Sequence, residues 1–171
     1  MLVAVLMASF VGCTKVDGNG DNEDKVALEG DLSAIIEKIY EKEKIDLNVA
    51  NNPVDLNDAD NLQYNVGLSD ASKIKEAVVS EAMISSQAYS LVLLRVKDAA
   101  DAESVAKDML AGINQRKWIC VEADDLQVVT YDDAVLLVMV ASTMKENVTS
   151  QKIVDAFGEI VGADFDLKLS K

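Results

Sequence analysis

Two nearly uninterrupted apolar segments, residues 89–96 and 134–141, place the strongest constraint on how this chain can fold. Segments of this length that are rich in valine and leucine are typical of strands buried inside a sheet. Each is preceded by a second strand-like segment, 77–84 in the first case and 126–131 in the second. The aspartate pair 132–133 lies between the last two strands and indicates a tight hairpin turn. We therefore expect two antiparallel pairs of strands.

Segments with helical spacing of their apolar residues surround the two strand pairs. Residues 31–44 precede the first pair, 99–115 follow it and 149–161 follow the second. In each segment apolar residues recur every three or four positions, which predicts an amphipathic helix. Asp31 is a suitable N-cap for the first helix, and Gly162 a suitable C-cap for the last. The repeated strand-strand-helix order indicates either an internal duplication or two apolar strands that are alike in composition alone.

This order predicts an α+β fold, in which an N-terminal helix and two strand-strand-helix units form a mainly antiparallel sheet with helices on one face. Residues 46–61 are rich in asparagine and contain the single proline, Pro53, so we expect an irregular connection there. The short amphipathic segment 62–66 is compatible with either type of element. Residues 165–169 alternate between apolar and polar types and could add an edge strand. Residues 31–171 are expected to form a single domain.

The composition excludes several classes of function. Among the 171 residues there is no histidine, and there are only two cysteines. Ser-His-Asp and Cys-His catalytic arrangements are therefore excluded, as are histidine-containing metal sites and zinc sites built on thiolates. The net charge is −14, so the chain repels nucleic-acid phosphates and anionic lipid headgroups. We expect no nucleic-acid partner, no bound metal and no cofactor.

The N-terminus has the pattern of a bacterial export signal. Residues 2–11 form an uncharged apolar run, about half the length that a helix needs to cross a bilayer. The run ends in Phe10-Val11-Gly12-Cys13, which resembles the lipobox of bacterial lipoproteins, although Phe10 stands where leucine is usual and no Lys or Arg precedes the run. The resemblance implies that a signal peptide, residues 1–12, is removed and that the Cys13 thiol carries a diacylglyceryl group. The alternative is a buried N-terminal element with an ordinary cysteine.

The segment after Cys13 is acidic and polar. Residues 13–30 are predicted to be a flexible, self-repelling linker that lifts the domain off the membrane, to which two acyl chains give stable anchoring. Within it, residues 17–22 partly match a calcium-binding loop, but Asn22 occupies the position that requires glycine. A linker is the preferred interpretation. The implied location is the extracytoplasmic face of a cell membrane.

Five segments of the domain carry a second resemblance. They are the helix 31–44, Glu81-Ala-Met-Ile-Ser-Ser, Tyr89-Ser-Leu-Val-Leu-Leu-Arg-Val-Lys, Ala102-Glu-Ser-Val-Ala-Lys-Asp-Met-Leu and Asp133-Ala-Val-Leu-Leu-Val-Met-Val. Their order and apolar pattern are similar to a domain family of unknown function that is common in lipoproteins of clostridia-like Gram-positive bacteria. The match would cover about residues 30–161, and it implies a small extracytoplasmic domain without catalytic residues.

Acidic residues form three close groups that could support hydrolysis. Paired carboxylates cleave glycosidic bonds when an apolar pocket raises the pKa of one of them. No acid lies in an aromatic, sugar-binding context, so solvated turns are the preferred interpretation. The groups are Asp55, Asp58 and Asp60; Asp124 and Asp125; and Asp132 and Asp133.

Arg116-Lys117-Trp118 is the one basic and aromatic cluster of this acidic chain. A ligand anion or a partner could dock there. The preferred interpretation is that the two bases complement the end of a helix while Trp118 packs into the core. Cys120 is flanked by apolar residues and is expected to be a small buried core residue.

These observations predict a membrane-anchored extracytoplasmic lipoprotein that acts as a non-enzymatic binding or accessory module. An envelope protein and a small ligand are equally open as its partner. The alternative is an envelope hydrolase that depends on acidic residues. Apart from lipidation at Cys13, the sequence predicts no catalytic, cofactor-binding or metal-binding residue.

Overall fold

The computed structural model describes residues 27–171 of the chain. Three predicted features lie outside the described residues: the signal peptide 1–12, the lipidation site Cys13 and the calcium-loop-like segment 17–22. Of the linker 13–30, only the last four residues are described.

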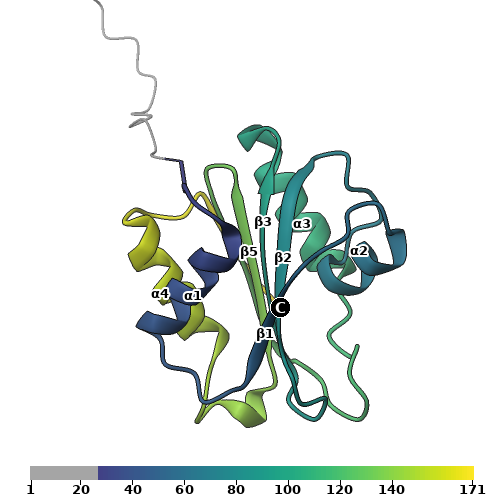
Figure 1. Ribbon diagram of the computed structural model, residues 1–171, viewed down its shortest axis with the longest axis vertical. Coiled ribbons are helices and arrows are strands. Elements are labelled where there is room, and N and C mark those ends of the chain that lie inside the picture. Colours follow the sequence, from purple (N-terminus) through teal and green to yellow (C-terminus); the bar gives the residue numbers. More distant parts are fainter. Residues whose placement is uncertain (1–26) are drawn as a thin grey trace, which may run out of the picture.

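The centre of the fold is a six-stranded antiparallel sheet, as the sequence predicts for the fold class (Figure 1). The strand order across the sheet is β1-β2-β3-β5-β4-β6, so the two apolar segments noted above lie side by side at its centre. Every residue of β3 and β5 is buried. The strands are β1 Val49–Pro53, β2 Ile74–Ala82, β3 Tyr89–Val96, β4 Asp125–Tyr131, β5 Ala134–Val140 and β6 Leu167–Ser170.

Four α-helices pack on this sheet, and two short 3-10 turns precede the last two of them. The predicted caps are confirmed, since the Asp31 side chain accepts a hydrogen bond from the Ala34 amide at 3.1 Å and Gly162 ends the last helix with a φ of 68°. The helices are α1 Leu32–Lys42, α2 Ala59–Val66, α3 Ala102–Gly112 and α4 Ser150–Val161, and the turns are Ala99–Asp101 and Ser142–Met144.

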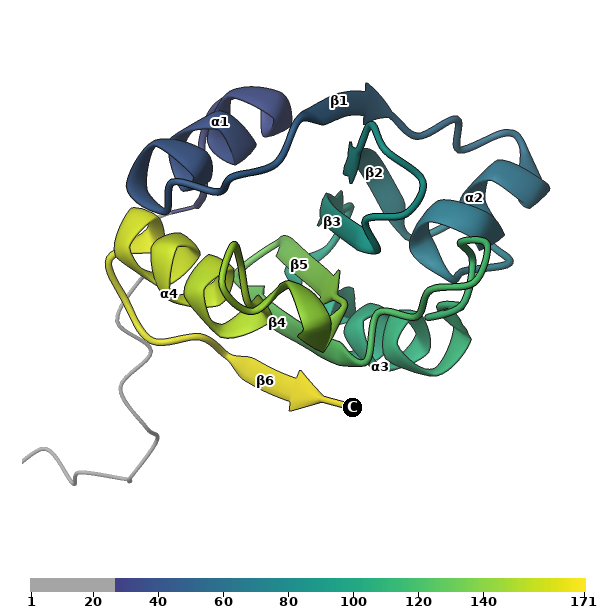
Figure 2. The ribbon, with the colours of Figure 1, turned by 90° about the horizontal axis from the view of Figure 1, so that it is seen from below.

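The helices cover both faces of the sheet, which corrects the prediction that they lie on one face. Figure 2 shows α1 and α4 on one side and α2 and α3 on the other. The physical reason is the composition of β3, whose side chains point alternately to the two faces. Leu91 and Leu93 pack with α1 and α4, while Val92 and Leu94 pack with α2 and α3. Because both sets are apolar, both faces need a cover.

The segment 46–61, predicted to be irregular, contains the edge strand β1 and the start of α2. β1 pairs with the outer side of β2, and Pro53 ends it, which is where a strand tolerates a residue without an N–H. At the opposite edge the alternating tail adds β6, as expected.

The chain enters the domain at the end of the sheet where β2 begins and β3 ends. Arg95 of β3 is buried and donates to the carbonyl oxygens of Leu28 and Gly30 at 2.6 and 2.7 Å. Its guanidinium also lies 2.5 Å from a carboxylate oxygen of Glu76. We call these residues the Arg95 cluster. They fix the first described residues at one end of the sheet, roughly 20 Å along β2 from the loop that leads to β3.

Candidate functional site

At the other end of the sheet, Lys117 is the centre of a buried polar and aromatic cluster. Its side chain is 1% exposed, and its ammonium lies 2.5 Å from a carboxylate oxygen of Glu81 on β2. The ammonium donates to the Ser90 hydroxyl at 3.2 Å, and it lies 4.8 and 5.3 Å from the ring centroids of Tyr64 and Trp118. Burial lowers the pKa of Lys117, and the Glu81 carboxylate opposes that shift. We call these five residues the Lys117 cluster.

The Lys117 cluster holds the loop of residues 113–123 against the sheet. The loop is closed at its base by two hydrogen bonds between Gln115 and Ala123, of 2.9 and 2.7 Å. An exposed ion pair of 2.6 Å joins Arg116 to Glu122 within it. A serine beside a lysine can serve as a nucleophile and its base, but Ser90 is fully buried, so no substrate reaches it. The cluster therefore fixes the loop against the sheet.

Three sequence predictions fall in this loop. Lys117 does not complement a helix end, because it pairs with Glu81 on the sheet. Trp118 packs partly buried against the core, in line with the prediction. The prediction that Cys120 is buried is wrong. Cys120 is exposed and has a φ of 64°, which lies in the left-handed region that turns use. Its apolar neighbours in sequence belong to a loop and not to a strand start.

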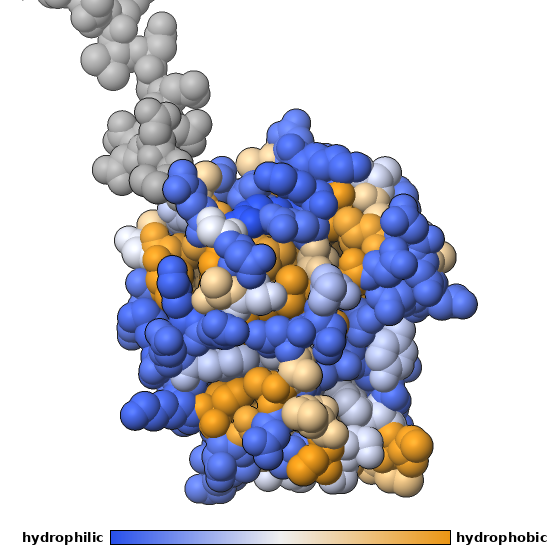
Figure 3. Space-filling view, in the orientation of Figure 1, coloured by the Kyte–Doolittle hydropathy of each residue, from blue (hydrophilic) through white to orange (hydrophobic). Residues whose placement is uncertain are grey.

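The large hydrophobic side chains that are exposed in the described part of the chain belong to the Lys117 cluster or to segments that adjoin its members in sequence. They are Tyr64 of α2 (48% exposed), Met83 (71%) and Ile84 (49%) in the β2–β3 loop, and Ile119 (82%) in the loop 113–123. We call these four residues the apolar patch. In Figure 3 hydrophobic side chains lie at the lower end of the molecule, where Figure 1 places the β2–β3 loop, and others lie in the upper half of the same face. Exposed apolar residues that gather in this way mark interaction surfaces more often than scattered ones do.

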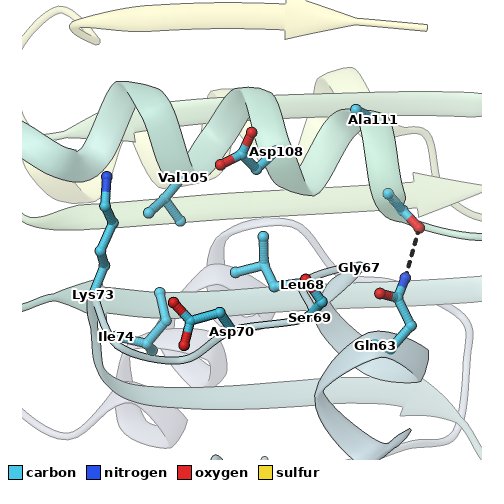
Figure 4. Close-up of a pocket in the computed structure, with 11 residues that line it drawn as sticks. Gln63, Gly67, Leu68, Ser69, Asp70, Lys73, Ile74, Val105, Asp108 and Ala111 are labelled. Atoms are coloured by element: carbon cyan, nitrogen blue, oxygen red, sulfur yellow. Dashed lines mark hydrogen bonds between the residues drawn. The ribbon is translucent and has the colours of Figure 1, made fainter. Parts of the chain in front are cut away.

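A cleft of about 550 Å³ lies between α2 and α3 (Figure 4). At one end Gln63 donates to the carbonyl oxygen of Gly112 at 3.0 Å. At the other end Lys73 pairs with Asp101 at 2.7 Å, and this contact raises the pKa of Lys73. The Asp70 carboxylate accepts hydrogen bonds from the backbone amide and hydroxyl of Ser72, which lower its pKa. An aspartate held ionised in this way is not a general acid.

The acids predicted as possible catalysts instead make local structural contacts. Asp124 accepts from the amide and the hydroxyl of Ser142 at 2.7 Å each, and these bonds lower its pKa. Asp125 accepts from the amide of Ser150 at 2.9 Å and from its hydroxyl, at the start of α4. Asp58 accepts from the first amides of α2 and so caps that helix.

The remaining acidic candidates are also at turns. Asp55 accepts from the amide of Asn57 at 2.9 Å, and Asp60 lies in the first turn of α2. Asp132 has a φ of 50° in the predicted hairpin turn. Burial, and then the neighbouring Asp132, raise the pKa of Asp133. The structure thus distributes the acids over several turns and does not bring the three groups into one site.

Within residues 27–171, no group of three or more Cys, Asp or Glu side chains could hold a metal ion. No helix in the same range has the length and hydrophobicity that crossing a membrane would require. No protein-family description, curated protein sequence or solved structure matches the chain.

Proposed function

We propose that this chain is a lipid-anchored extracytoplasmic binding module, attached to a cell membrane through Cys13, which contacts an envelope protein through the apolar patch. The observation that carries the binding role is the concentration of exposed large hydrophobic side chains at the end of the sheet opposite the Arg95 cluster. A domain tethered through the segment ahead of Leu28 would present that end away from its point of attachment.

The structural use of the acids supports this proposal over a hydrolase. A glycoside hydrolase needs two carboxylates on either side of one bond, with the pKa of one of them raised. Here Asp124 and Asp125 are held by serine residues at helix and turn starts, and hydrogen bonds lower the pKa of Asp124 and Asp70. Asp133, whose pKa is raised, lies with Asp132 at the turn between β4 and β5. The hydrolase remains the alternative function.

The anchoring half of the proposal is tested by metabolic labelling with radioactive palmitate in a Gram-positive host that expresses the full-length gene. The two cysteines provide a matched pair of variants. We expect label on the wild-type chain and on Cys120→Ala, no label on Cys13→Ala, and release of the Cys13→Ala chain from the membrane fraction. Label that persists in Cys13→Ala, or a wild-type chain that carries none, would refute the anchor.

The binding half is tested with a photo-crosslinking amino acid placed in the native envelope. Substitution at Ile119 or Met83 should give adducts of one reproducible mass, because these side chains lie in the apolar patch. Substitution at the exposed Asp164, beyond α4, is the control and should give none. Adducts of equal yield at all three positions would contradict a binding role for the patch.

A further inference from the structure

The apolar patch and the charges around it define the kind of partner that fits it. We propose that the partner is a cationic amphipathic protein segment, whose apolar side chains cover Ile84 and Ile119 while a Lys or Arg side chain pairs with Asp60 on α2. This inference rests on the binding role proposed above and adds the chemistry of the occupant.

The loop 113–123, which carries Ile119 of the patch, is held in place before any partner binds. Lys117 and Glu81 join the loop 113–123 to β2, and the bonds between Gln115 and Ala123 close the loop. Binding to a surface already fixed in this way costs little conformational entropy. Ile119 is therefore exposed on a loop whose conformation is already fixed.

A negative charge that no base neutralises lies next to the patch. Asp60 lies four residues before Tyr64 on α2, so the two side chains share a face of that helix. Asp60 is exposed and pairs with no base in the described part of the chain. The bases nearby are already engaged, Arg116 with Glu122 and Lys117 with Glu81.

The net charge of the domain selects between possible occupants. Residues 27–171 contain 26 acidic and 14 basic side chains, a net charge of −12. A second copy of the chain and an anionic membrane would both be repelled, whereas a cationic segment would be attracted and steered. The patch also lies at the end of the sheet away from the Arg95 cluster, where the chain enters the domain.

Trp118 provides the signal for the test, because it is the sole tryptophan of the chain and belongs to the Lys117 cluster. The probe is a 14-residue amphipathic peptide of leucine and lysine, titrated into the full chain carrying Cys13→Ala while Trp118 emission is recorded. Two control peptides replace every lysine by glutamate or every leucine by serine. We expect saturable binding of the first peptide alone, weakened severalfold as salt is raised from 50 to 500 mM.

Three variants locate the binding site. Ile84→Ser and Ile119→Ser should each weaken binding about tenfold, and Asp60→Asn about threefold. Ile160→Ser, on α4 at the other side of the sheet, is the control and should bind as the parent chain does. Circular dichroism melts establish that each variant is folded.

The proposal would be overturned if Ile84→Ser and Ile119→Ser bound the leucine-lysine peptide as tightly as the parent chain, or if the glutamate peptide bound the parent chain equally well. It would also be overturned if the parent chain bound vesicles that contain phosphatidylglycerol, or if it formed a dimer in sedimentation equilibrium that Ile119→Ser abolishes. The palmitate experiment is independent of these. If the chain is labelled with palmitate but does not bind the cationic peptide, the proposed partner is refuted and the lipid anchor is supported. If the chain is not labelled but binds the peptide, the anchor is refuted and the partner is supported.

Discussion

Replacement of Gly112 by alanine should destabilise the domain, although alanine is the better helix former. Gly112 is the last residue of α3, and it lies directly against Gly67, the C-cap of α2. A Cβ on Gly112 would lie 2.0 Å from the carbonyl oxygen of Gly67, where real Cβ contacts are not found below 3.0 Å. The two backbones would have to separate by about 1 Å or more, and the contact atom is backbone that cannot rotate away.

The magnitude follows from three opposing contributions. Alanine gains at most about 1 kcal/mol in helix propensity, and less at the end of a helix. Forcing backbone atoms apart in a packed region costs about 3 kcal/mol at the upper end of overpacking effects. The hydrogen bond from Gln63 to the Gly112 carbonyl contributes about 1 kcal/mol and would be strained or lost. We expect a net loss of about 3 kcal/mol, or about 6 to 12 °C in Tm for a domain of this size.

Gly158→Ala is the matched control, a second glycine-to-alanine change within a helix. A Cβ there would meet only the ring of Phe165, at 3.4 Å, which is an ordinary contact with a side chain. We expect this variant to be unchanged or up to about 1 kcal/mol more stable. Urea unfolding followed by far-UV circular dichroism measures both variants, with equal m-values as the check that the unfolded states are alike. A Gly112→Ala protein as stable as Gly158→Ala would refute the close approach of α2 and α3.

Three other perturbations test separate parts of the structure. Arg95→Gln removes the charged donor to the carbonyls of Leu28 and Gly30, so the free energy of unfolding measured in urea should fall by about 3 kcal/mol. Limited trypsin digestion should also remove the N-terminal segment of this variant faster. Burial raises the pKa of Tyr40 to about 12, so the folded state keeps a phenol proton that the unfolded state loses near pH 10. The free energy of unfolding should therefore fall by about 2 kcal/mol between pH 10 and 12. Tyr40→Phe should show a smaller fall in unfolding titrations over that range. Cys120 should react completely with Ellman's reagent at pH 8 without denaturant, and a thiol that reacts only after unfolding would contradict its exposure.

The central part of the fold was predictable because its signal is local. The apolar runs that form β3 and β5, and the helical spacing from 149 to 161, each lie within a short stretch of sequence. The number of covered faces was also encoded, since a strand with apolar residues at successive positions needs packing on both sides. What the pattern does not state is which helix covers which face, because that depends on how the connections run.

The features missed depend on partners that are distant in sequence. β1 has asparagines and a proline, which are poor strand formers, and it is a strand because β2 offers it an edge. Lys117 is buried because Glu81, 36 residues earlier, lies beside it. Cys120 follows apolar residues that suggest a strand, yet the contacts of the loop 113–123 turn it outward. The apolar patch became visible only when the loops carrying it were brought to one end of the sheet.

The Arg95 cluster determines how the domain would respond to a pull on the chain ahead of Leu28. The two carbonyl groups that Arg95 holds belong to the incoming segment, while Arg95 itself belongs to β3, in the middle of the sheet. Tension would therefore pass first to a central strand, whose neighbours on both sides share the load, before it could peel α1 from the surface. A pull on the tether would therefore have to break the hydrogen bonds of Arg95 before it loads α1.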